Sequence, residues 1–128
     1  MRLVLDTDSR MNLVRRYGEG TVVIGEHTLT RPLIVTPTQL LTDWPVISLE
    51  ALEVAQLEPL FGLSAQVVLL GSGERQSYPS AVVRAAFRQR GIALECMTLG
   101  AACRTYNILA GEQRSVVAGL FPGTAGGG

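Results

Sequence analysis

The 128-residue sequence contains no lysine, one histidine and two cysteines. All eleven of its basic residues are therefore arginines. Without lysine, the chain can form neither a Schiff base with a carbonyl substrate nor the lysine contact of a P-loop. These absences remove two common classes of enzyme mechanism.

Excess charge and long apolar runs are also missing. Eleven acidic residues balance the eleven arginines, and no apolar run approaches the roughly 18 residues of a membrane span. A neutral chain is a poor ligand for nucleic acid, because non-specific binding to phosphates depends on positive charge. Neutrality also gives little protection against self-association, so oligomerisation stays open. We expect a soluble globular protein with no membrane insertion and no nucleic-acid partner.

The N-terminal residues do not have the pattern of a targeting signal. The apolar run at residues 3–5 is too short for a signal-peptide core, and Asp6 and Asp8 are untypical of a transit peptide. We therefore expect a cytoplasmic location, where Cys96 and Cys103 stay reduced.

Few residues are candidates for catalysis or metal binding. His27 lies in a predicted turn, where an imidazole is difficult to desolvate and orient as a general base. Cys96 and Cys103 are not in C-x-x-C spacing, and with one histidine they cannot complete a zinc site without distant carboxylates. We predict no catalytic residue, no metal site and no cofactor, and we expect an interaction protein rather than an enzyme.

The first third of the chain has the pattern of antiparallel sheet. Three β-rich runs, at residues 13–17, 21–24 and 29–35, are separated by glycine-bearing turns. Proline cannot donate a hydrogen bond to the ladder, so we expect an edge or a bend at Pro32. These runs predict an N-terminal β meander.

After Trp44 the pattern changes to alternating helix and strand. The predicted elements are a short helix within residues 53–61, a strand at 66–70, a helix at 80–90, a strand at 92–97, a helix at 99–110 and a strand at 115–121. Pro59 is tolerated only in a first helical turn, so the first helix starts late or breaks there. The run at 66–70 has no polar alternation, which indicates a central strand.

Together these elements predict an α/β or α+β domain. It has three layers, with a central mixed sheet, the N-terminal meander and two to three covering helices. We expect residues 1–121 to form one globular domain and residues 122–128 to form a flexible tail.

The glycine-bearing segment between Gly71 and Pro79 is a candidate binding loop. Gly71, Ser72 and Gly73 would let the backbone approach a ligand, and Arg75 would supply a forked anion donor near a helix start. However, the segment has neither P-loop spacing nor a complete dinucleotide fingerprint. The alternative, which we favour, is a strand-to-helix turn.

Two further features have alternative interpretations. Tyr106 and Asn107 follow Thr105 in a predicted helix that is apolar on both sides of this segment, at residues 101–103 and 108–109. They would either line a ligand pocket or hold the core and a nearby loop backbone. We expect one concave site if this helix lies beside the Gly71 loop. Trp44 would either anchor a partner protein or cap the core.

Several short motifs occur along the chain in a characteristic order and spacing. They are Tyr17-Gly18, Trp44-Pro45, Leu70-Gly71-Ser72-Gly73, Pro79, Gly91-Ile92, Met97-Thr98, Ala102, Thr105-Tyr106-Asn107-Ile108-Leu109 and Val116-Val117-Ala118. Their order and spacing resemble a small domain family that includes mitochondrial complex I assembly factor three. The resemblance covers nearly the whole chain and implies a three-layer fold with a central mixed sheet. It also implies a role as an assembly helper that acts through protein contacts.

Two functional hypotheses follow. The first is a non-enzymatic protein-interaction or assembly module with an unidentified protein partner. The second is a small-molecule or anion-binding protein that uses the loop from Gly71 to Pro79. The absence of a complete catalytic set and the family resemblance favour the first.

Overall fold

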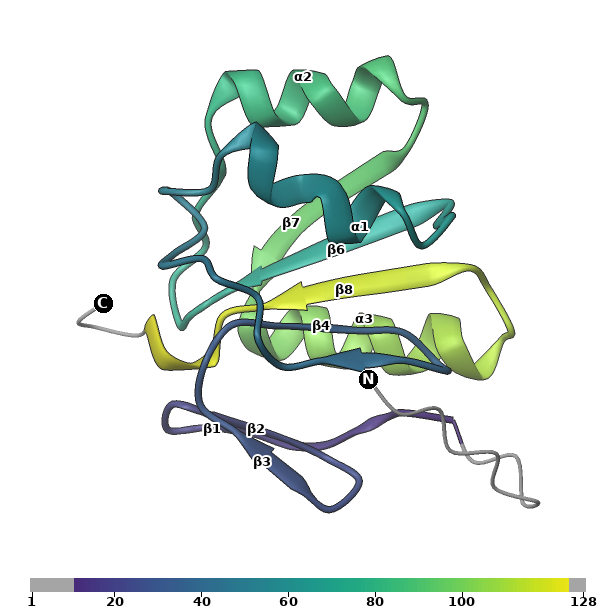
Figure 1. Cartoon of the computed structure of the whole chain (residues 1–128). Coiled ribbons are helices and arrows are strands. Elements are labelled where there is room, and N and C mark those ends of the chain that lie inside the picture. The colour runs from purple at the N-terminus through teal and green to yellow at the C-terminus, as the bar shows by residue number, and fades with distance from the viewer. Residues whose placement is uncertain (1–10, 125–128) are drawn as a thin grey trace.

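The computed structural model describes residues 11–124, which form two β-sheets and three α-helices (Figure 1). Asp6 and Asp8, on which the expectation about targeting depends, and the last four residues of the expected tail lie outside this range. The elements in chain order are β1 Val14–Gly18, β2 Thr21–Ile24, β3 His27–Leu29, β4 Leu33–Val35, β5 Leu40–Leu41, the 3-10 helix η1 Val54–Leu57, α1 Glu58–Phe61, β6 Val67–Ser72, α2 Ala81–Gln89, β7 Ala93–Thr98, α3 Leu99–Gly111, β8 Val116–Leu120 and the 3-10 helix η2 Pro122–Thr124.

The larger sheet has five strands in the order β5-β4-β8-β6-β7. Strands β8, β6 and β7 run parallel, whereas β4 is antiparallel to both β8 and β5. The sheet is therefore mixed, as predicted. Strand β6 pairs on both sides and is an interior strand, although β8 rather than β6 occupies the middle of the five.

The two faces of this sheet support two separate hydrophobic cores. Successive strand residues point to opposite faces, and accordingly Leu69 belongs to one core while Val68 and Leu70 belong to the other. Helix α3 packs on the Leu69 face together with the three-stranded sheet. Helices α1 and α2 cover the opposite face. In Figure 1, α1 lies in front of the five-stranded sheet and α3 lies behind it. The layered α+β prediction is confirmed.

The predicted meander forms a sheet of its own. Strands β1, β2 and β3 pair antiparallel in that order. The run at residues 29–35 was expected as one strand, and this expectation is wrong. It contains the end of β3 and all of β4, which belong to different sheets. Pro32 has no N–H for a ladder and lies between them, so the chain leaves one sheet and enters the other.

Side-chain caps fix the starts of the two long helices. The Ser80 hydroxyl accepts a hydrogen bond from the Val83 N–H, and the Thr98 hydroxyl accepts one from the Ala101 N–H. Each cap satisfies one of the four free N–H groups that begin a helix. Pro59 lies in the first turn of α1, as expected for a helix that starts late.

The described chain continues beyond the predicted domain boundary at residue 121. Residues 122–124 form η2, and Pro122 is buried. Pro122 lies beside the start of α3, near Leu99 and Gly100. No helix within residues 11–124 is long and apolar enough to cross a membrane.

Candidate functional site

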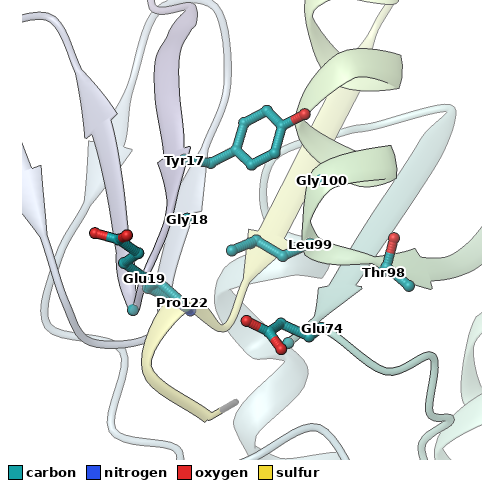
Figure 2. Close-up of a pocket in the computed structure, with 10 residues that line it drawn as sticks. Tyr17, Gly18, Glu19, Glu74, Thr98, Leu99, Gly100 and Pro122 are labelled. Carbon is teal, nitrogen blue, oxygen red and sulfur yellow. The ribbon is translucent and has the colours of Figure 1, made fainter.

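A cleft of about 240 Å³ opens where the three-stranded sheet meets the start of α3. Four segments line it: residues 17–20 around the β1–β2 turn, residues 73 and 74 after β6, residues 98–100 at the start of α3, and Pro122 (Figure 2). Strands β6 and β7 are parallel neighbours, so their carboxyl ends bring Gly73 and Thr98 to the same sheet edge. Ligands bind beyond such strand ends in many open α/β sheets.

The β1–β2 turn forms one wall of this cleft. Gly18, Glu19 and Gly20 all have positive φ, at 131°, 53° and 80°. Glycine adopts such angles freely, whereas the non-glycine Glu19 is uncommon there. The turn therefore presents a carboxylate and bare backbone at the rim.

The first turn of α3 forms the opposite wall and depends on Gly100. A Cβ at Gly100 would lie 2.9 Å from Cε1 of Tyr17, so only glycine lets the tyrosine ring pack this closely. Arg104, one turn further along, donates a 2.5 Å hydrogen bond to the Tyr17 hydroxyl. Tyr17 is thus held at the junction between β1 and α3.

The predicted Gly71 loop contributes only in part to this cleft. Gly73 lines it, but a Cβ at Gly71 would lie 2.7 Å from the Cβ of Ala102, so that glycine permits close packing of β6 on α3. The Ser72 hydroxyl donates to the Arg75 carbonyl at 2.6 Å and accepts from the Ser77 N–H. The Arg75 side chain is exposed and does not line the cleft. Ligand binding by these residues stays a prediction.

Tyr106 and Asn107 hold β1 against α3. The Tyr106 hydroxyl donates to the Asn12 carbonyl at 2.7 Å. The Asn107 amide accepts from the Val14 N–H and donates to the Val14 carbonyl, both at 2.9 Å. These contacts favour the interpretation that the pair serves the core and nearby backbone. Tyr106 and Asn107 lie about two helical turns from the cleft rather than within it.

Trp44 lies in the core on the other face of the sheet. Its side chain is 4% exposed, and its ring centroid is 5.4 Å from that of Phe121. The indole N–H donates to the Gln56 carbonyl at 3.0 Å. The burial favours the core-capping interpretation, and the predicted partner contact stays untested.

The cysteines lie outside the cleft, with Cys103 buried and Cys96 partly buried. Burial raises the pKa of Cys103 to about 12, against an opposing effect of Arg104. Burial also raises the pKa of Cys96, with Arg84 acting in the opposite direction. Both groups therefore stay protonated near neutral pH. Within the described part of the chain, no three His, Cys, Asp or Glu side chains are grouped to hold a metal.

Sequence reasoning missed most residues of the cleft. Tyr17, Glu19, Glu74 and Gly100 were not among the predicted ligand contacts, although Tyr17-Gly18 and Met97-Thr98 were part of the family pattern. Two features of the sequence could have indicated these residues. They are Glu19 between two glycines, and Gly100 in the first turn of a predicted helix.

The fold and cleft define a small layered α+β domain with a mixed sheet and a cleft at its parallel strand ends. The chain belongs to the family described as protein of unknown function (DUF498/DUF598), whose model matches residues 14–121. This confirms the family resemblance found in the sequence.

Relatives of this chain have different names. It is 35% identical over 116 residues to NADH dehydrogenase [ubiquinone] 1 alpha subcomplex assembly factor 3 of Danio rerio, covering 89% of this chain and 66% of that protein. The chain therefore spans slightly less than two thirds of that relative. It is 26% identical over 103 residues to the 13 kDa major membrane protein of Francisella tularensis, covering 80% of this chain and 84% of that one.

Among solved structures, an NMR structure of a Xanthomonas campestris protein is similar, with a TM-score of 0.84 and 38% identity. That match covers 98% of this chain and 95% of the other. It supports the observed fold over nearly its whole length.

Proposed function

We propose that this chain is a non-enzymatic protein-interaction module that helps a larger complex to assemble. The observation that carries the proposal is the 35% identity to an assembly factor of NADH dehydrogenase over most of the chain. The proposal does not extend to which complex this chain helps to assemble, because another relative is named as a major membrane protein.

The chemistry of the cleft supports binding rather than catalysis. Neither histidine nor cysteine is among the described residues that line it, and the Tyr17 hydroxyl already accepts a hydrogen bond from Arg104. The Thr98 hydroxyl already accepts the Ala101 N–H as a helix cap. An interaction surface needs shape and polar contacts but no such pair.

A cytoplasmic location is part of the proposal, because the two free cysteines, Cys96 and Cys103, suit a compartment in which thiols stay reduced. The second hypothesis, anion binding by Arg75 and the Gly71 loop, receives less support. Gly71 and Ser72 both have packing or hydrogen-bonding roles that account for their identity.

The test is to capture the tagged protein from its native cells after brief cross-linking, with quantitative mass spectrometry as the readout. We expect the subunits of one complex to be enriched and to be displaced by an excess of untagged chain. Enrichment that untagged chain does not displace would contradict the proposal.

A thermal-shift screen against phosphate and nucleotides tests the second hypothesis in parallel. A ligand at 100 times its dissociation constant adds about 2.7 kcal/mol of stability. A specific shift that Arg75→Ala abolishes would favour anion binding over the assembly role.

A further inference from the structure

The cleft has the size of a pocket for one side chain. Its volume of about 240 Å³ lies below the roughly 300–1,000 Å³ of pockets that enclose a drug-sized ligand or cofactor. Protein interfaces often concentrate their binding energy in one anchor residue that fills such a pocket. The size therefore suits an anchor residue from another protein.

The floor of the cleft is apolar. Leu99 is 6% exposed, Pro122 is buried, and the ring of Tyr17 forms part of the wall. Figure 2 shows the Leu99 side chain pointing toward the β1–β2 turn. Such a floor suits the methylene stem of a long side chain.

The charges at the rim are negative. Glu19 and Glu74 are the charged side chains among the described lining residues, and both are exposed. In Figure 2 the Glu74 carboxylate points toward Pro122, whereas the Glu19 carboxylate points away from the centre of the cleft. Glu74 is therefore the better placed partner for a cation inside the cleft.

An anion is less well matched, although a helix begins here. The N–H groups of Leu99 and Ala101 are already bonded, to the Gly73 carbonyl and the Thr98 hydroxyl. The guanidinium of Arg104 does not line the cleft and is engaged by the Tyr17 hydroxyl. The donors that usually hold an anion at a helix start are thus largely used within the protein.

We propose that the cleft receives one arginine or lysine side chain of a partner protein. Its stem packs on Leu99, Pro122 and the Tyr17 ring, and its cationic head pairs with Glu74. This inference rests on the proposed interaction role and identifies the chemistry of the partner at this surface.

The test uses NMR amide shifts of the full chain titrated with an N-acetylated, C-amidated arginine. We expect the shifts to be largest at Gly18, Gly20, Gly73 and Gly100. The same probe with a citrulline side chain, the uncharged isostere of arginine, should bind more weakly. Inorganic phosphate should not shift these four glycines.

Two matched variants test whether Glu74 is the carboxylate that pairs with the cationic head of the probe. Glu74→Gln should weaken binding of the arginine probe by about three- to fivefold, the size expected for one exposed ion pair. Glu26→Gln removes an exposed carboxylate in the β2–β3 turn and should leave binding unchanged. Equal effects of the two variants, equal binding of the citrulline probe, or phosphate shifts at the four glycines would each overturn the proposal.

Failure of this inference can be distinguished from failure of the proposed function. If the wild-type chain captures its complex and Glu74→Gln captures it equally well, only the cleft assignment is overturned. If the wild-type chain captures no displaceable partner, the interaction role itself is overturned.

Discussion

The two faces of the five-stranded sheet are covered in different ways. On the α2 face, large apolar side chains fill the core, and Trp44, Phe121 and Phe87 have ring contacts. On the α3 face, a second apolar core is supplemented by polar side chains, because Tyr106 and Asn107 hold the backbone of β1 in place. The cleft opens on this second side.

This difference concerns how the smaller sheet is attached. The α2 face is filled by bulky packing, which leaves little room for a further side chain to enter. On the α3 face, the three-stranded sheet is docked partly through hydrogen bonds to β1, and a hollow remains where the β1–β2 turn meets the start of α3. Substitutions on the two faces and a pH titration test this contrast, in decreasing order of their expected cost in stability.

Trp44→Ala should reduce the free energy of unfolding by about 3–5 kcal/mol, because it empties a buried site next to Phe121. Chemical denaturation measures this loss. Trp44→Phe is the milder control, since it keeps a ring but removes the hydrogen bond to the Gln56 carbonyl. Wild-type stability of Trp44→Ala with loss of partner capture would instead show that the indole serves the interface.

Gly71→Ala should reduce the free energy of unfolding by about 1–3 kcal/mol, because the new Cβ would lie 2.7 Å from that of Ala102. The matched control is Gly111→Ala at the end of α3, where a Cβ would meet nothing within 4 Å. The control should be neutral or stabilising by up to about 1 kcal/mol. Equal stability of the two variants would show that close packing on α3 is not required.

Asn107→Ala should cost about 1–2 kcal/mol, since it removes two hydrogen bonds to the backbone of Val14. Hydrogen exchange provides the specific readout, because the Val14 amide should lose protection while amides in β6 keep theirs. Tyr106→Phe, which removes one bond to Asn12, should cost about 1 kcal/mol. Unchanged protection at Val14 would contradict the role assigned to Asn107.

Alkaline pH should destabilise the protein through Cys103. The raised pKa of about 12 means that the folded state keeps the thiol proton while the unfolded chain loses it above about pH 9. The free energy of unfolding should therefore fall by about 1 kcal/mol between pH 9 and pH 10, and it should keep falling toward pH 12. Cys103→Ala should reduce this slope more than Cys96→Ala, because Cys96 is only partly buried. Equal slopes in wild type and Cys103→Ala would contradict this account.

Much of the fold could be predicted from local sequence. Helix caps at Ser80 and Thr98 and the apolar run of β6 depend on neighbours in the chain. The split between β3 and β4 could not be predicted, because the pairing of each half depends on strands that are distant in sequence. Local preference alone does not decide which sheet a strand joins.

The residues of the cleft were harder to predict from the sequence than the fold. Tyr17, Glu74 and Thr98 come from three separate segments, and their meeting depends on how the three-stranded sheet docks on α3. The parallel order of β6 and β7 would have brought Glu74 and Thr98 together. The position of the β1–β2 turn had no comparable local signal.

We propose that a partner protein binds at the cleft on the α3 side of the sheet rather than on the α2 side. The most direct test places a photo-crosslinking amino acid at Tyr17, which lines the cleft and is 40% exposed, or at Val82, which is 67% exposed on α2. Both variants are irradiated in native cells, and the cross-linked proteins are identified by mass spectrometry. We predict a partner cross-link from position 17 and none from position 82. A cross-link from position 82 with none from position 17 would contradict the claim.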